Sequence, residues 1–196
     1  MSKRLVGFNF SEHMRLICED MTSRVAALRH IQMNRVGVGF CQARTGSVDY
    51  GVFASLTPLR CENGARTTLR RGRRYTLPQF FAPDGTEYLY LINFYIPRFL
   101  QRSFKDKLIT TVHELLHISP NFDGDIRRFG GRCYAHSGSQ KNFDAYAEQL
   151  ASLWLAMKPP VELYDFLHED FRSLEAKYGG IYGTKFPKVC FIRVDE

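Results

Sequence analysis

The sequence predicts an α+β fold, and two kinds of residue pattern carry this prediction. Apolar residues recur at helical intervals in three segments, 11–29, 104–118 and 141–157. Two other segments, 34–44 and 86–96, are rich in β-branched and aromatic residues, which favour strands. Together these segments predict a small mixed sheet that packs on several helices.

The strand near 34–44 is expected to lie close to another element. Its apolar residues alternate with small ones at Gly37, Gly39 and Cys41. Glycines inside a strand mark places where another part of the chain approaches the backbone. The helix of 11–29, with Ser11 as its expected N-cap, is expected to pack on a sheet.

The helix of 104–118 has a start signal and a stop signal. Ser103 stands three residues before Asp106, as at a helix N-terminus, and Pro120 ends the pattern. The less regular segments predict extended structure at Tyr50–Leu56 and Thr67–Leu77, a helix over Val161–Tyr178 and a final strand at Val189–Val194.

Length and composition bound the class of protein. A chain of 196 residues, 44% of them hydrophobic, can bury one sizeable core, so a single domain over 1–196 is expected. The five cysteines form no Cys-x-x-Cys pair, and no run of about 18 apolar residues occurs. These features favour a cytoplasmic protein that makes no contact with membranes.

Positive charge is concentrated in the N-terminal part of the chain. The net charge is +7, and residues 1–75 hold 13 Lys or Arg against 5 Asp or Glu. Part of this excess lies in an arginine-rich insertion at 57–76, which ends beside Tyr75. Arginine suits phosphate oxygens and a neighbouring ring can stack on a base, so the insertion predicts a nucleic-acid contact, with a solvated loop as the alternative. The candidate contact residues are Arg66, Arg70, Arg71, Arg73 and Arg74.

The run His113-Glu114-Leu115-Leu116-His117 predicts a metal site on the helix of 104–118. Two histidines four residues apart project from one face, because four residues turn about 400° around the helix axis. They can therefore bind one zinc ion. Glu114 is turned away from direct ligation and stands where a general base can reach a zinc-bound water.

A catalytic zinc needs a third protein ligand, and His136 is the first candidate. It lies in the polar segment Tyr134-Ala-His-Ser-Gly-Ser139, after the helix that carries the motif. The alternatives are the acidic residues Asp123, Asp144 and Glu148. Asp144 and Glu148 suit another role better, in which a carboxylate accepts a hydrogen bond from a ligand imidazole.

The connection that follows His117 is dense in Asp, Arg and Gly. An ion pair within it is expected to brace the loop, either Asp125–Arg127 or Asp123–Arg128. Arg132 or Tyr134 could instead donate a hydrogen bond to the oxyanion that forms when water attacks a carbonyl. Tyr134 is therefore a candidate catalytic residue.

The segment Thr111-Val-His-Glu-Leu-Leu-His-Ile-Ser-Pro120, with His136 and Phe143-Asp144 downstream, resembles the SprT/Spartan-like zincins and the related phage-type metallopeptidases. The resemblance covers residues 86–157. Spartan-like proteases act on proteins crosslinked to DNA, and many carry a cysteine-rich zinc ribbon. This sequence has no cysteine pairs of that kind.

The resemblance implies a minimal zincin-like domain and peptide-bond hydrolysis with water activated by Glu114. It also implies a zinc ion held by His113, His117 and His136.

The expected function is therefore that of a zinc metallopeptidase, with nucleic-acid-associated proteins as one candidate class of substrate. Tyr95 and its strand are expected to pair with an extended peptide substrate. Two alternatives stay open. One is a zinc amidase of the deformylase type, in which Cys41 or Cys61 would be a ligand. The other is a nucleic-acid- or protein-binding module in which zinc is only structural.

Overall fold

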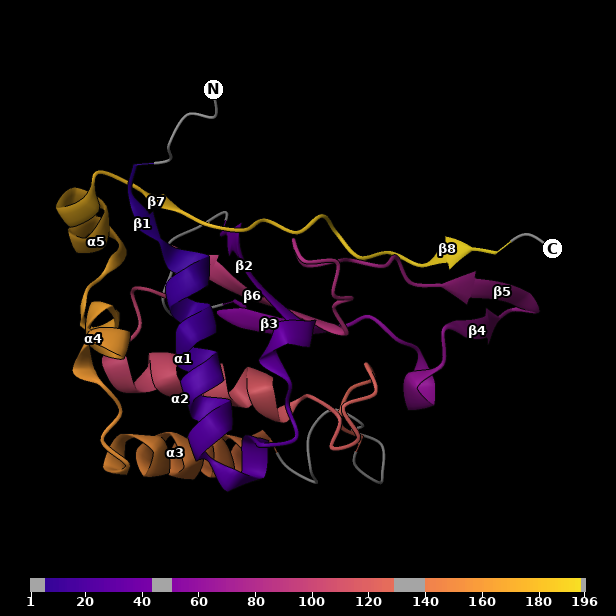
Figure 1. Cartoon of the computed structure of the whole chain (residues 1–196), viewed down its shortest axis with the longest axis horizontal. Helices are drawn as coiled ribbons and strands as arrows, with labels where there is room; N and C mark the ends of the chain where they lie inside the picture. Colours follow the sequence, from indigo (N-terminus) through magenta and orange to yellow (C-terminus); the bar gives the residue numbers. More distant parts are fainter. Residues whose placement is uncertain (1–5, 44–50, 129–139, 195–196) are drawn as a thin grey trace.

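The computed structural model describes residues 6–43, 51–128 and 140–194, and it confirms the α+β class (Figure 1). The strands are β1 Phe8–Asn9, β2 Val36–Gln42, β3 Ala54–Pro58, β4 Thr67–Arg70, β5 Arg73–Thr76, β6 Tyr90–Ile96, β7 Ile181–Tyr182 and β8 Ile192–Arg193. The α-helices are α1 Phe10–Arg24, α2 Phe104–Leu116, α3 Gln140–Ala156, α4 Val161–Tyr164 and α5 Phe171–Tyr178. Short 3₁₀ helices are Ala26–Leu28, Met33–Arg35, Glu62–Gly64 and Asp165–His168.

The central sheet has the strand order β2-β6-β3. β2 runs parallel to β6, with Val38 opposite Ile92, and β3 runs antiparallel to β6, with Leu56 also opposite Ile92. β6 is therefore the middle strand, and β3 forms one edge of the sheet. Two smaller sheets have the orders β1-β7 and β4-β5-β8.

One face of the central sheet packs against helices. Phe40 of β2 and Phe94 of β6 point to this face, where both rings meet Phe10 of α1 edge-on, at centroid distances of 6.3 and 5.9 Å. Phe10 and Phe94 are fully buried. Because these side chains alternate with others on the same strands, the helices bury only every second residue of the sheet.

The other face of the sheet lies against the C-terminal segment. A Cβ atom added to Gly37 would lie 2.7 Å from the ring of Phe186, and one added to Gly39 would lie 2.8 Å from it. The backbone N–H of Phe40 donates to the carbonyl of Thr184 at 3.0 Å. The expectation that another element lies close to the glycines of this strand is confirmed, and Figure 1 shows the yellow C-terminal segment running over β2 towards β8.

The start of α1 differs from its prediction. Asn9, not Ser11, is the N-cap, because its side-chain oxygen accepts from the N–H of Glu12 at 3.3 Å. Ser11 is buried inside the helix, and its hydroxyl accepts instead from the N–H of Thr184 at 2.9 Å. This hydroxyl thus ties α1 to the C-terminal segment.

Helix α2 begins as predicted. The Ser103 hydroxyl accepts from the N–H of Asp106 at 3.1 Å, so the helix starts at Phe104. Lys107 is buried at 2% exposure, and its ammonium donates to the carbonyls of Leu167 and Glu169 at 2.9 and 2.8 Å. These bonds fix α2 against the chain that follows α4, and α3 runs below α2 in Figure 1.

The prediction of one helix over Val161–Tyr178 is wrong. The segment consists of α4, the 3₁₀ helix Asp165–His168 and α5. A break occurs because Asp170 is extended and caps α5, its carboxylate accepting from the N–H of Ser173 at 2.8 Å. An Asp that satisfies the first turn of a helix starts a new helix more readily than it continues an old one.

The arginine-rich insertion forms a hairpin that projects away from the helices (Figure 1). The hairpin is formed by β4 and β5 in the second half of the insertion, after the 3₁₀ helix Glu62–Gly64, and β8 adds a third strand to it. The predicted final strand at Val189–Val194 is thus reduced to the two residues of β8. Among the described residues, no helix has the length and apolar character needed to cross a membrane.

Candidate metal centre

The two histidines of the motif converge at the C-terminal end of α2. Their Nε2 atoms lie 3.0 Å apart, and their ring planes cross at 76°. The helix ends at Leu116, two residues earlier than predicted, yet His117 keeps helical backbone angles as the C-cap. Both imidazoles therefore project from the same face.

This nitrogen pair fits a zinc ion. Imidazole nitrogens bind zinc at about 2.0–2.1 Å, so two of them on a tetrahedral ion lie about 3.3 Å apart. The observed 3.0 Å separation of the Nε2 atoms is close to that value. Neutral imidazole and zinc also suit each other chemically, since histidine is among the commonest ligands of this metal.

Asp144 of α3 orients the first histidine. Its Oδ1 atom lies 2.9 Å from Nδ1 of His113. A carboxylate can only accept at this contact, so Nδ1 carries the hydrogen and the lone pair of Nε2 points towards His117. Asp144 therefore accepts a hydrogen bond from the imidazole of His113, which is the arrangement that orients a ligand histidine in metal sites.

Phe143 holds both imidazoles from the side. Its ring stacks on His117 at a centroid distance of 4.9 Å and meets His113 edge-on at 4.9 Å. The sequence places Phe143 on the apolar stripe of α3, but nothing in one sequence shows that the stripe faces the histidines. Its neighbour Asp144 reaches His113 because α3 packs along α2.

Glu114 is enclosed beside the edge strand β3. The residue is 7% exposed, and burial raises the pKa of its carboxyl to about 7, while the backbone N–H of Leu56 donates to it and opposes this rise. Among the described residues no Lys or Arg forms an ion pair with Glu114, and a buried carboxyl in such surroundings costs free energy when charged. Groups of this kind occur preferentially at functional sites. The contact with Leu56 was not foreseen, because it joins residues 58 positions apart in sequence.

A cavity of about 890 Å³ opens beside these residues, and we call it the site cavity. His113, Glu114 and Asp144 line it from the helices, and residues 51–54 line it from the start of β3. The carboxyl of Glu114 and the imidazole of His113 therefore share one solvent-accessible space.

The other acidic candidates for the third ligand are engaged elsewhere. Asp123 accepts a hydrogen bond from the N–H of Asp125 at 3.1 Å, within the loop after α2. Glu148 forms an ion pair with Lys105. Within the described part of the chain, no three His, Cys, Asp or Glu side chains form a metal-binding group, so neither Cys41 nor Cys61 joins the two histidines. His136, Tyr134 and Arg132 lie outside the described residues, and their roles stay predictions.

The loop after α2 is braced, but not by the predicted pairs. Asp125 binds Arg128 through two contacts of 2.8 and 3.0 Å. Arg127 instead hydrogen-bonds to the end of α2, with its Nε donating to the carbonyl of Leu116 at 2.7 Å and its N–H to that of His117 at 2.6 Å. Arg127 is thereby held at the end of α2, which leaves Arg128 as the ion-pair partner of Asp125.

The arginines of the insertion separate into two groups. Arg66 binds the carboxylate of Glu87 at 3.3 Å, next to the buried Arg60, which binds it at 2.7 Å. By contrast, no Asp or Glu of residues 6–43, 51–128 and 140–194 forms an ion pair with the four arginines of the hairpin, Arg70, Arg71, Arg73 and Arg74. Arg66 thus has an acidic partner, whereas the four hairpin arginines have none among the residues that the structure describes.

Comparison of the chain with family models, with curated proteins and with solved structures gives no match. The protein is of the α+β class, with two convergent imidazoles, a carboxylate that orients one of them, and a buried glutamate beside them.

Proposed function

We propose that this protein is a zinc-dependent peptidase whose metal centre contains His113 and His117, with Glu114 as the general base. The observation that carries the proposal is the 3.0 Å approach of two Nε2 atoms, one of them fixed in its tautomer by Asp144. His136 is the proposed third ligand.

The chain's own residues supply the proton transfers and the orientation. Zinc, when bound, acts as a Lewis acid towards water and the substrate carbonyl oxygen. Glu114 accepts a proton from the attacking water and donates it to the nitrogen of the leaving amine. Its enclosed position beside Leu56 limits competition from solvent, and Phe143 keeps both imidazole rings in place.

The substrate strand is expected to pair with β3 and not with the strand of Tyr95. β6, which carries Tyr95, already has β2 on one side and β3 on the other, so the earlier expectation is wrong. The N–H of Tyr95 donates to the carbonyl of Phe53, and that of Leu59 donates to Leu89. In an antiparallel pair the intervening residues Ala54 and Leu56 direct their backbone groups outward. The N–H of Leu56 already donates to Glu114, so an extended peptide that adds to this edge would pair with the backbone groups of Ala54 and with the carbonyl of Leu56.

The test is cleavage of an unbiased peptide library, followed by mass spectrometry. Zinc-loaded protein is expected to cut peptides, and chelator-treated protein is not. Activity should return when zinc is added back, but not in His117→Ala at the same zinc concentration. Equal cleavage before and after chelation would overturn the zinc-dependent mechanism.

The alternatives predict different outcomes in this assay. A zinc amidase of the deformylase type would release acyl groups from blocked amines and leave internal peptide bonds intact. A binding module with structural zinc would bind the metal and cut nothing. Neither Cys41 nor Cys61 accompanies the histidines, which weakens the deformylase comparison.

A second candidate function is contact with single-stranded nucleic acid through the arginine hairpin, residues 67–76. The turn contains Arg71 with φ of 49° and Gly72 with φ of 72°. Two-residue turns of this geometry favour Asn or Asp before Gly, so an arginine at the first position is held at some conformational cost. The cationic side chain of Arg71 therefore stands at the tip of the hairpin, at a position where the turn geometry favours another residue.

Aromatic rings accompany these cations. Arg71 and Arg73 line a cavity of about 670 Å³ together with Arg70, Tyr75 and Phe191. The guanidinium of Arg70 lies 3.5 Å from the centroid of the Phe191 ring, and Tyr75 meets the same ring edge-on at 6.4 Å. Guanidinium groups bind phosphates and rings stack on bases, which is the combination that single-stranded nucleic acid requires.

A further inference from the structure

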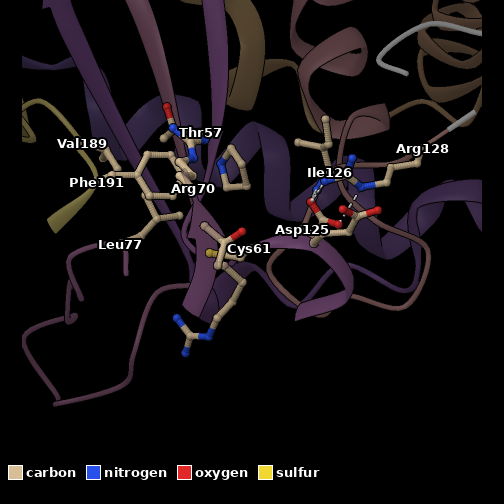
Figure 2. Close-up of a pocket in the computed structure, with 13 residues that line it drawn as sticks. Thr57, Cys61, Arg70, Leu77, Asp125, Ile126, Arg128, Val189 and Phe191 are labelled. Carbon is tan, nitrogen blue, oxygen red and sulfur yellow. Dashed lines mark hydrogen bonds and ion pairs between the residues drawn. The ribbon is translucent and has the colours of Figure 1, made fainter. Parts of the chain in front are cut away.

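A second cavity, which we call the distal cavity, lies at the far end of β3 (Figure 2). Its volume is about 420 Å³. Figure 2 shows Leu77, Val189 and Phe191 on one side, and Asp125, Ile126 and Arg128 on the other. Thr57 and Pro58 of β3 and Thr68 of β4 complete its wall. Four separate segments of the chain thus form one hollow.

Strand β3 runs from the site cavity to the distal cavity. Ala54 lines the site cavity, Leu56 donates to Glu114, and Thr57 and Pro58 line the distal cavity. The wall of the distal cavity that contains Ile126 is also linked to the metal centre. The N–H of Arg127, the residue after Ile126, donates to the carbonyl of His117. Glu114 and His117 are therefore each hydrogen-bonded to a residue next to the wall of the distal cavity.

The spacing along β3 sets which part of a bound peptide reaches the distal cavity. An extended chain advances about 3.3 Å per residue, so the two residues from Leu56 to Pro58 span about 7 Å. A peptide paired with β3 and cut beside Glu114 would place a side chain two residues from the scissile bond at the mouth of this cavity.

Most charged groups of the distal cavity already form ion pairs within the protein. Asp125, which is 4% exposed, binds Arg128 and accepts from the N–H of Asn63 at 3.0 Å. Arg60 is 8% exposed and bound to Glu87. The remaining surface is largely apolar, from Pro58, Leu77, Ile126, Val189 and Phe191. Burying apolar surface is thus the main favourable free-energy term that a ligand can gain here.

Arg70 adds a preference for aromatic rings. Its guanidinium carbon lies 3.5 Å from the centroid of the Phe191 ring, and both residues line the cavity. The opposite face of a guanidinium plane can accept a second ring, with a further cation–π contact.

We propose that the distal cavity is a substrate subsite for a large apolar side chain, preferably aromatic, located two residues from the scissile bond. This inference rests on the proposed peptidase function. It assigns the specificity of that function to Thr57, Thr68, Arg70, Ile126 and Phe191.

The cleavage test uses blocked octapeptides of Ala, Ser and Gln in which a single Phe is moved through positions 1 to 8. Zinc-loaded wild type is expected to cut at a constant distance of two residues from Phe, on one side. Thr68→Trp, which fills the cavity, is expected to lose this preference. Leu69→Trp is the matched control, because Leu69 is the next residue of β4, is 72% exposed and does not line the cavity.

Peptide binding tests the subsite without turnover. Glu114→Gln protein is titrated with fluorescent octapeptides, and the Phe peptide is expected to bind at least about tenfold more tightly than the Phe-free parent. Introducing Thr68→Trp should abolish the difference, and Phe191→Ala should reduce it, with unchanged thermal unfolding showing that each variant folds. Absence of cleavage together with a retained binding preference would reject the peptidase and keep the subsite. Equal binding of both peptides, or an unchanged preference in both variants, would overturn the subsite.

Discussion

Nδ1 of His113 lies 2.9 Å from Oδ1 of Asp144, across the contact between α2 and α3. Because the carboxylate accepts the Nδ1 hydrogen, the lone pair of Nε2 is directed towards His117. Helices α2 and α3 pack through apolar side chains, and this packing also fixes the tautomer of His113, a proposed zinc ligand. The relationship gives Asp144 the role of orienting His113, beside Phe143, which packs against both histidine rings.

The first prediction concerns this carboxylate. Asp144→Ala should weaken zinc binding about 10- to 100-fold, because His113 loses the partner that orients it. Competition with a zinc chelator of known affinity measures the change. Glu148→Ala is the matched control, since Glu148 lies one turn further along α3 and pairs with Lys105. Equal losses in both variants would contradict the assigned role of Asp144.

The second prediction concerns Glu87, which anchors the arginine-rich insertion. Glu87→Ala should lower the free energy of unfolding by about 3 kcal/mol, because the buried Arg60 is left without its partner. Urea denaturation measures the loss, and Glu62→Ala, at an exposed site before the hairpin, should change little.

The same residue predicts an acid dependence. Burial raises the pKa of Glu87, but hydrogen bonds from Gln79, Arg60 and Arg66 outweigh this and lower it below its usual value. The unfolded state therefore takes up the proton first, and the stabilisation is lost as the pH falls below about 4.3. The stability difference between wild type and Glu87→Ala should shrink over this range. A constant difference would contradict the lowered pKa.

The third prediction concerns Lys107 under α2. Burial lowers the pKa of its ammonium to about 8, although Asp170 and Glu169 favour the charged form. Between pH 8 and 10 the unfolded state then binds more protons, so stability should rise with pH by up to about 3 kcal/mol. Lys107→Met should lack this rise. Parallel stability curves for the two proteins would show that Lys107 titrates normally.

The fourth prediction concerns the arginine hairpin. Replacing Arg71, Arg73 and Arg74 with Ala should weaken binding of labelled oligo(dT) and reduce the slope of log K against log salt by about 2. These arginines do not line the distal cavity, so the change leaves the proposed subsite intact. A control that removes three exposed charges elsewhere, Arg29, Lys158 and Arg172, should keep the slope. Equal slopes in both triple variants would exclude a specific role for the hairpin.

Local sequence signals predicted the elements that carry the site. Ser103 and the apolar spacing locate α2 to within two residues, because capping and helical periodicity act between near neighbours. The same local signals gave wrong predictions at two helix boundaries. Ser11 makes a tertiary hydrogen bond to Thr184 and is not a cap, and Asp170 caps a second helix where one continuous helix was predicted.

Contacts between distant segments were not predictable from one sequence. The N–H of Leu56 meets Glu114, and Phe143 meets both histidines, only because β3 and α3 pack on either side of α2. The order of strands in a sheet also depends on contacts between distant segments. Because β6, the strand of Tyr95, is the middle strand, the edge proposed for substrate pairing is β3.

The turnover of Glu114→Gln at full zinc occupancy tests the account most directly. Gln cannot accept the proton of the attacking water, but it preserves the size of the side chain and leaves both imidazoles in place. We predict zinc content equal to wild type and a kcat on the best library peptide lowered about 10²- to 10⁴-fold. Equal kcat values in wild type and Glu114→Gln, with equal zinc, would contradict the proposed mechanism.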